Sequence, residues 1–301
     1  MGKRKTAAAV LALVFSLFSI SAAYAGEEKS AEQPSYVKIA AIPENAEALE
    51  GEYIPVLMYH HFAVRNMGTG NGVVTTTKEL EDQLHYFKSQ GYKIITLEEL
   101  DKLLTKAEKN TRAEGIGLGL GQKYLCITMD DGYYSNYELG YPLFQKYRAP
   151  ASVFAVTDYV TEQIGIRKFT WKQAQEMEKG GWLKVYSHTA DHQPVEAGQE
   201  ADFLASMERS EEALTANLEG KHVKAMAYPN GRFTEESQRL LEEEGYVLQF
   251  TIENGVITRE TARNALPRIT ITSGMDGKDV VRKIELAAEK AFAAEREGNE
   301  T

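Results

Sequence analysis

Two short motifs carry most of the chemistry in this sequence. Asp130 and Asp131 stand side by side after an apolar run, and His188 and His192 follow four residues apart after another. Two histidines in that relation can face one ion from a single turn, and a carboxylate at a strand end can complete a set of three ligands. A second carboxylate beside this set can accept the proton of a water molecule. The pattern therefore predicts a hydrolase that activates water on a divalent metal ion.

Neither motif is specific by itself, because aspartate and glycine are ordinary turn residues. Their order, with each motif directly after an apolar segment, is more specific. Two other hydrolase classes are disfavoured. The metalloprotease motif His-Glu-x-x-His does not occur in the sequence, and the Asp-x-Asp spacing of a phosphohydrolase is absent around Asp130.

The start of the chain has the features of a secretory signal. Basic residues 3–5 precede an apolar stretch at 7–20, and the small residues of Ala23–Ala25 predict cleavage after Ala25. An uncleaved anchor is the alternative, although the stretch is short for a membrane span. We therefore expect a protein that is secreted or associated with the cell envelope, with no stable membrane span after cleavage. Residues 26–52, rich in glutamate and alanine, are expected to form a flexible acidic linker.

The charge of the chain limits its partners. The net charge is -10, and removal of the signal peptide would remove three positive charges. No basic cluster remains, which argues against nucleic acid and anionic lipid as partners and permits a neutral or cationic glycan. The single cysteine, Cys126, cannot form an internal disulfide and is predicted to be a small buried hydrophobic residue. The remaining chain is long enough for one large domain, expected to be a monomer.

Apolar strands alternate with amphipathic helices along the rest of the chain. Strands are predicted at 53–59, 93–96, 124–128, 151–156, 183–186, 223–228, 247–251 and 267–272, and helices at 77–91, 97–104, 137–147, 170–179, 201–218, 235–244 and 277–296. Alternation of this kind implies parallel pairing and right-handed crossovers. Without a dinucleotide-binding motif, a closed or nearly closed barrel is favoured. Catalytic residues of such barrels gather at the carboxyl ends of the strands, where His60, Asp130 and His188 are expected.

The motifs resemble those of polysaccharide deacetylases of the NodB-homology group, carbohydrate esterase family four. The family motif Thr-Phe-Asp-Asp-Gly is matched by Thr128–Gly132, and His-Ser/Thr-x-x-His is matched by His188–His192. The third motif, Arg-x-Pro-Tyr-Gly, has its equivalent in Ala227–Gly231, where the arginine is absent. The resemblance covers about residues 53–275.

The layout is most similar to the branch of poly-β-1,6-N-acetylglucosamine deacetylases. Pro55–His61 resembles the first strand of that branch, and Leu266–Ile269 resembles its last segment. The resemblance implies a distorted (β/α)7-type barrel of the polysaccharide deacetylase kind. This single catalytic domain would occupy residues 53–301, with a C-terminal helix at 277–296.

The resemblance also implies the ligands of a metal site. Asp131, His188 and His192 would hold a divalent ion, and Asp130 would be the general base. Zinc is the expected ion, although cobalt and nickel accept the same ligands. Binding to such an ion brings the pKa of water toward ~7, so a carboxylate can remove its proton near neutral pH.

The general acid is not in its usual place. The family takes this histidine from a late Leu-x-His segment, but no histidine follows His222. In the resembling branch the N-terminal strand supplies it, which points to His60, and cleavage of an amide needs a proton donor for the leaving amine. His61 is the alternative. Adjacent residues of a strand point opposite ways, so only one of the two is expected to face the site.

Further residues are assigned to the substrate and to the base. Tyr228, Pro229 and Asn230 are expected to border the substrate, with the backbone N–H of Asn230 stabilising an oxyanion. Tyr133 and Tyr228 are candidates to stack on sugar rings. In the family, the missing arginine pairs with the base aspartate and holds it ionised. Arg268, on the last predicted strand, is the candidate replacement.

The expected function is metal-dependent removal of N-acetyl groups from an extracellular N-acetylglucosamine polysaccharide of the β-1,6-linked kind, with release of acetate. Deacetylation of N-acetylglucosamine in peptidoglycan is one alternative. A catalytically silent glycan-binding protein on the same fold is another. The absence of the family arginine and of the late histidine favours the silent protein, whereas the complete metal-binding set and base oppose it.

Overall fold

The computed structural model describes residues 52–66, 72–109, 118–161 and 165–299. The expected signal peptide and linker, up to residue 51, lie outside the described residues. Every element described below belongs to residues 42–301, which form one compact unit. Within the described ranges, no helix has both the length and the apolar character needed to cross a membrane.

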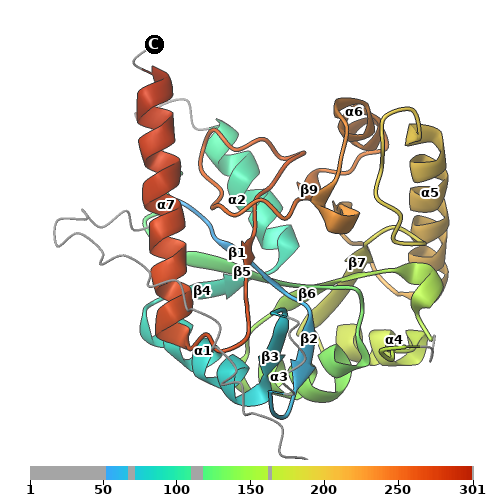
Figure 1. Cartoon of the computed structure of the whole chain (residues 1–301), viewed down its shortest axis with the longest axis horizontal. Helices are drawn as coiled ribbons and strands as arrows, with labels where there is room; N and C mark the ends of the chain where they lie inside the picture. Colours follow the sequence, from blue (N-terminus) through green and yellow to red (C-terminus); the bar gives the residue numbers. More distant parts are fainter. Residues whose placement is uncertain (1–51, 67–71, 110–117, 162–164, 300–301) are drawn as a thin grey trace, which may run out of the picture. The chain divides into compact units, whose positions relative to one another are not determined.

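Parallel strands form the main sheet (Figure 1), in the order β10-β1-β5-β6-β7-β8-β9, with β4 also paired to β5. The strands are β1 (Val56–Tyr59), β4 (Lys93–Ile95), β5 (Tyr124–Asp130), β6 (Ala151–Ala155), β7 (Leu183–Ser187), β8 (Ala225–Ala227), β9 (Leu248–Phe250) and β10 (Ile269–Thr270). All eight predicted strands are present, although β1, β8, β9 and β10 are shorter than the sequence indicated.

The sheet curls and its two ends meet. Cys126 of β5 pairs with β1 on one side and β4 on the other, and the later part of β5 pairs with β6. At the far end, Phe250 of β9 forms a parallel bridge with Leu266, which leads into β10. The predicted parallel barrel with distorted closure is therefore confirmed.

Side chains of β5 alternate between two environments. Leu125, Ile127 and Met129 belong to the apolar cluster that contains residues of the surrounding helices. Cys126 belongs instead to a second cluster, which contains side chains of β6 to β9 and of helix α2 (Leu97–Lys109), and it is fully buried as predicted. Because strand side chains alternate, Asp130 points to the same side as Cys126. The period of the strand thus puts a carboxylate inside the barrel at the strand's carboxyl end.

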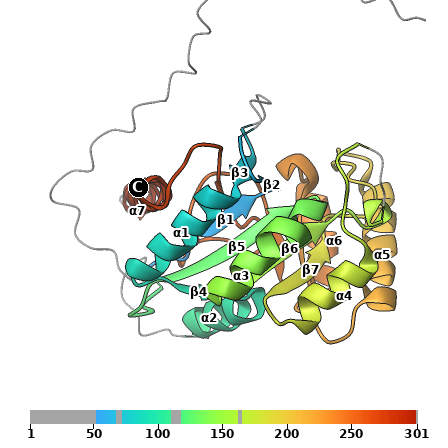
Figure 2. The ribbon, with the colours of Figure 1, turned by 90° about the horizontal axis from the view of Figure 1, so that it is seen from below.

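The helices connect successive strands and cover the sheet. They are α1 (Thr77–Ser89), α2 (Leu97–Lys109), α3 (Tyr141–Tyr147), α4 (Trp171–Lys179), α5 (Glu200–Asn217), α6 (Glu235–Glu243) and α7 (Gly277–Asn299). Figures 1 and 2 show α1, α3 and α4 in a row against one face of the sheet. Helix α1 begins at Thr77 as predicted and is capped by Thr76, which forms a capping box with Glu79.

Two features near the site were not predicted. Short strands β2 (His61–Ala63) and β3 (Val74–Thr76) pair in parallel outside the main sheet. The helix predicted from residue 137 begins as a π-helical turn, Asn136–Gly140. Three-residue strands are too short to show a period, and π-turns have no sequence signature. Such turns occur frequently at functional sites. Here the Asn136 side chain donates a hydrogen bond to the carbonyl oxygen of His60 (2.8 Å).

Candidate active site

The three predicted metal ligands converge at the carboxyl ends of β5 and β7. Asp131, His188 and His192 each present one ligand atom, and these atoms lie within 4.8 Å of one another. Oδ1 of Asp131 is 3.7 Å from Nε2 of His188 and 3.5 Å from Nε2 of His192. The side chain of His188 is 3% exposed, whereas that of His192 is 30% exposed. The cluster is therefore closed to solvent on the side of His188 and open to solvent on the side of His192.

Left-handed backbone conformations bring these side chains together. Asp131 has φ 71°, Thr189 φ 63° and His192 φ 60°. Such values are uncommon outside glycine, and for a β-branched residue such as threonine they are outliers. The two histidines thus reach one another through an irregular loop and not through a regular turn of helix. Strain of this kind, held by the surrounding structure, is typical of functional sites.

Hydrogen bonds fix the histidine loop. The N–H of His192 donates to Oγ1 of Thr189 (3.0 Å). Asp191 points elsewhere: its carboxylate accepts from Ser206 (2.8 Å) and from Arg209 (2.9 Å), both on α5. Asp191 is therefore a structural residue that ties the loop to α5, although it lies inside the His-x-x-x-His motif.

The hydrogen-bond partner of His188 decides which ring nitrogen carries the proton. Nδ1 of His188 lies 2.7 Å from the carbonyl oxygen of Ala227. Because a carbonyl oxygen only accepts, Nδ1 carries the proton and Nε2 keeps a lone pair toward Asp131. Burial lowers the pKa of His188, which keeps the imidazole neutral. A neutral imidazole and a carboxylate in these positions fit a divalent cation, and the contact with Ala227 is the usual outer support of such a ligand.

Asp130 is paired with Arg268 inside the barrel. The guanidinium donates two hydrogen bonds of 2.7 Å, one to each carboxylate oxygen. It also donates to Oγ1 of Thr128 (3.2 Å) and to the carbonyl oxygen of Thr251 (2.8 Å). Arg268 is fully buried, and Asp130 is 2% exposed. The structure thus puts Arg268 on the carboxylate that the family arginine would contact, from a different strand.

This pairing keeps Asp130 ionised. Burial by itself raises the pKa of the Asp130 carboxyl, yet the charge and hydrogen bonds of Arg268 outweigh it. The pKa of Asp130 therefore falls from its ordinary value of 3.8 to about 2. Asp130 is therefore available as a proton acceptor throughout the neutral pH range.

The two N-terminal histidines have different neighbours. His60, between β1 and β2, is close enough to Asp130 to influence its pKa. Its Nδ1 is buried without a hydrogen-bond partner among the described residues. His61 instead places Nδ1 3.0 Å from Oγ of Ser135 and its ring edge-on to Tyr133 (5.3 Å between centroids). Both histidines border the aspartate loop, because the strand is interrupted at His60.

The prediction that Tyr228 stacks on a sugar ring is wrong. Its side chain is fully buried, with the ring against Phe203 and Phe233 and the hydroxyl donating to Gln249. The large apolar ring completes the core beneath α5 and α6.

The two residues that follow Tyr228 differ in their exposure to solvent. Pro229 is buried, so of the three predicted substrate residues only Asn230 is exposed. Asn230 has φ 53°, the fourth left-handed residue other than glycine among the predicted site loops. Its position at the end of β8 keeps it a candidate for contact with substrate.

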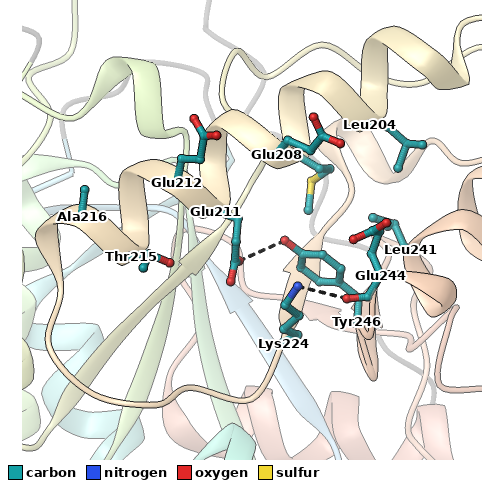
Figure 3. A pocket seen from close by; sticks show the side chains of 11 residues that line it. Leu204, Glu208, Glu211, Glu212, Thr215, Ala216, Lys224, Leu241, Glu244 and Tyr246 are labelled. Atoms are coloured by element: carbon teal, nitrogen blue, oxygen red, sulfur yellow. Dashed lines mark hydrogen bonds between the residues drawn. The ribbon is translucent and has the colours of Figure 1, made fainter.

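A groove of about 500 Å³ lies elsewhere, between α5, α6 and the starts of β8 and β9 (Figure 3). The hydroxyl of Tyr246 donates to Glu211 (3.2 Å), and the ammonium of Lys224 donates to the carbonyl oxygen of Glu244 (3.0 Å). Lys224 and Tyr246 precede β8 and β9, whereas the site residues follow their strands. None of the predicted site residues lines this groove, so it is separate from the candidate active site.

The barrel and the cluster define an α/β-barrel hydrolase with a candidate metal site at the carboxyl ends of its strands. A family model described as polysaccharide deacetylase matches residues 118–248, the range that holds both aspartates and both histidines. Over this range the chain is similar to polysaccharide deacetylases, and it is an enzyme that acts on amide bonds.

Individual relatives agree with this assignment. YxkH of Bacillus subtilis (strain 168), provisionally named a polysaccharide deacetylase, is 29% identical over 224 residues, which are 74% of this chain and 73% of YxkH. The Poly-beta-1,6-N-acetyl-D-glucosamine N-deacetylase of Staphylococcus epidermidis is 26% identical over 208 residues, which are 66% of this chain and 68% of that protein.

Solved structures support the fold. The structure of IcaB from Ammonifex degensii matches with a TM-score of 0.63 at 25% identity and covers 74% of this chain and 93% of IcaB. The Streptococcus pyogenes deacetylase PplD, in complex with acetate, matches with a TM-score of 0.67 at 24% identity. That match covers 77% of this chain and 98% of PplD.

Sequence reasoning did not single out Lys168, whose ammonium lies 3.7 Å from the centroid of the Tyr133 ring. Tyr133 itself was predicted to contact sugar, but one side of its ring is covered by this ammonium. The two residues are far apart in the chain, and no local pattern marks their pairing.

Proposed function

We propose that this deacetylase removes N-acetyl groups from an extracellular N-acetylglucosamine polysaccharide with β-1,6 linkages, in a metal-dependent reaction that releases acetate. The observation that carries the proposal is the arrangement of Asp131, His188 and His192 around one point, beside an Asp130 carboxylate that is held separately by Arg268. Three ligands next to a distinct ionised base are what amide hydrolysis on a divalent ion requires.

Each residue of the site has a separate proposed role in the reaction. A divalent ion held by Asp131, His188 and His192 supplies Lewis acidity, which polarises a carbonyl group and lowers the pKa of water toward ~7. Asp130 takes the proton of the attacking water. Arg268 holds the Asp130 carboxylate in place with two parallel hydrogen bonds, the geometry that makes such pairs directional.

His60 is the proposed donor of the proton that the leaving amine needs. It lies near Asp130, and its carbonyl oxygen is fixed by Asn136. The unpartnered Nδ1 can bind and pass on a proton, because no neighbouring group among the described residues occupies it. The backbone N–H of Asn230, an exposed residue after β8, is the proposed contact for the oxygen that becomes negative during attack.

The substrate class rests on three observations. A poly-β-1,6-N-acetylglucosamine deacetylase is among the relatives, with two thirds of its length matched. The strongly acidic chain suits a polymer that gains amino groups as it loses acetyl groups. The secretory pattern at residues 1–25 agrees with a polymer outside the cell.

The direct test is acetate release from β-1,6-linked and β-1,4-linked N-acetylglucosamine oligomers, with and without chelator. We expect release from the β-1,6 oligomers, loss of activity with chelator, and recovery when Zn²⁺ or Co²⁺ is restored. Preference for β-1,4 oligomers or peptidoglycan fragments would contradict the proposed substrate. Full activity of demetallated protein would contradict the metal dependence.

Replacing His192 with asparagine should lower the affinity for metal by more than about 100-fold. Loss of a residue that only supports a ligand by a hydrogen bond lowers metal affinity by about 10- to 100-fold, so loss of a ligand itself should exceed that range. Asparagine tolerates the left-handed backbone at this position, but its side chain is a poorer and shorter ligand. Metal content after dialysis measures the effect. As a control, unfolding in chelator should show wild-type stability to within about 1 kcal/mol. Retained metal would mean that His192 is not a ligand.

A further inference from the structure

The loop that carries His192 is bonded to helix α5. The hydroxyl of Ser206 accepts a hydrogen bond from the N–H of Ala190 (3.1 Å) and donates one to Oδ1 of Asp191 (2.8 Å). The guanidinium of Arg209, about one turn further along α5, donates to Oδ2 of the same carboxylate (2.9 Å). Ser206 is 3% exposed, so its hydroxyl lies in the interface between helix and loop. Asp191, the residue directly before His192, is therefore fixed to α5.

A single turn of 3-10 helix after β6, Thr157–Tyr159, holds the same loop. Its three residues donate in order to three consecutive carbonyl oxygens, those of residues 189–191. The first two bonds come from backbone N–H groups (3.2 and 2.9 Å), and the third comes from the hydroxyl of Tyr159 (3.2 Å). Nη2 of Arg209 lies 3.6 Å from Oδ2 of Asp158, so α5 contacts this turn as well as the loop.

The conformation held by these contacts is strained. Thr189 has φ 63° and His192 has φ 60°, both in the left-handed region that residues with a side chain rarely adopt. A strained backbone persists only where the surrounding structure holds it. The two histidines depend on this support to different extents, because His188 is buried and bonded to Ala227, whereas His192 is 30% exposed. His192 is therefore the predicted ligand whose place depends most on the loop.

We propose that Asp191 and Ser206 are positioning residues for His192, through which helix α5 holds the loop in the conformation that binds metal. The inference rests on the proposed metal centre and adds its support from outside the ligand set. Loss of either residue lets the loop relax into conformations in which His192 is turned away from the other two ligands. The apparent affinity for metal falls with the fraction of molecules that keep the binding conformation.

Replacing Ser206 with alanine tests this role without changing any charge. We expect the affinity of the demetallated full chain for Zn²⁺ and Co²⁺ to fall about 3- to 10-fold in a competition titration, because two hydrogen bonds of the loop are lost. The visible spectrum of bound Co²⁺ should also change, since it reports the coordination geometry. Ser237→Ala is the matched control: it removes a fully buried serine hydroxyl from α6 and should change affinity less than about twofold.

Two substitutions of Asp191 separate position from charge. Asp191→Ala removes the acceptor of Ser206 together with a negative charge near the ion, and should lower metal affinity about 10- to 100-fold. Asp191→Asn removes the charge but keeps an oxygen for Ser206 and for the N–H of Gln193, which also donates to Oδ1 (3.2 Å).

We expect Asp191→Asn to bind metal within about threefold of wild type, because a partly exposed charge acts weakly through solvent. Equal losses in the two Asp191 variants would show that charge and not position supports the metal, and would overturn the inference. The Asp191 side chain is 35% exposed, so both variants should fold even where Ser206→Ala does not.

The outcomes separate this inference from the metal centre itself. If wild-type protein binds metal and Ser206→Ala binds it within about twofold, the positioning role is overturned and the metal centre stands. If Ser206→Ala and Ser237→Ala lower the affinity equally, the loss comes from a weakened fold and the inference fails. If wild-type protein binds neither ion, the metal centre fails and this inference fails with it.

Discussion

Turnover should fall by about 10²- to 10⁴-fold when Asp130 is replaced with asparagine, while metal content stays at the wild-type level. Asparagine has nearly the same shape but cannot accept the proton of the attacking water. Asp131 and the two histidines remain, so the metal site is retained. Acetate release and metal analysis on the same preparation measure both parts. Activity close to wild type would show that another group is the base.

A complication of this variant is that it leaves Arg268 buried without an anionic partner. Part of any loss could then come from a weakened fold. The double variant Asp130→Asn/Arg268→Met removes both buried charges and should recover much of the stability. It should not recover activity. Recovered turnover in the double variant would contradict the role of Asp130.

The second large effect is expected on stability. Replacing Arg268 with methionine should lower the free energy of unfolding by about 3–5 kcal/mol at neutral pH, because a buried carboxylate is left without its partner. Activity should also fall, since Asp130 loses the two hydrogen bonds that orient it. Denaturant unfolding in the presence of chelator measures the stability of the metal-free protein.

The pH dependence of that difference has a definite sign. In the wild type, the pKa of Asp130 is lowered from 3.8 to about 2, so the pairing stabilises the fold above about pH 4 and loses this effect as the pH falls toward 2. Without Arg268, burial dominates and raises the pKa of Asp130. The stability gap between wild type and Arg268→Met should therefore be large at pH 7, shrink as the pH falls through the raised pKa of Asp130 in the variant, and be smallest near pH 2. A gap that is constant with pH would mean that packing, not charge, explains the loss.

Arg268→Lys separates charge from geometry. Lysine keeps the positive charge but cannot form two parallel hydrogen bonds with a carboxylate. We expect most of the stability at pH 7 to be retained and activity to remain reduced. Equal stability losses for the lysine and methionine variants would indicate that the paired geometry, more than the charge, holds this part of the barrel.

Much of the fold could be predicted because its signals are local. Apolar runs of strand length and amphipathic helices follow one another from residue 53, and parallel pairing follows from that alternation. The features that were missed are those without a period. Strands β2 and β3 have three residues each, and the π-turn at Asn136–Gly140 looks like ordinary helix in sequence.

In the site too, the features set by local sequence could be predicted and those set by packing could not. The motifs indicated the candidate ligands and Asp130, because motif spacing is a property of the chain. Tyr228 was misjudged, since an aromatic residue beside a motif can point to the core or to the solvent, and only packing against Phe203 and Phe233 decides between them. Lys168 was overlooked because its partner Tyr133 is distant in sequence.

The sequence by itself determined the class of fold, the chemical types of the site residues and the strand ends that carry them. Tertiary structure alone decided which of those residues meet. Arg268 contacts Asp130 across 138 residues of chain, through two hydrogen bonds whose geometry depends on how the barrel closes between β9 and β10. Periodicity specifies the face on which a side chain lies, but not the distance between atoms on different strands. That distance is set by the curvature of the sheet and by the packing of the core against it.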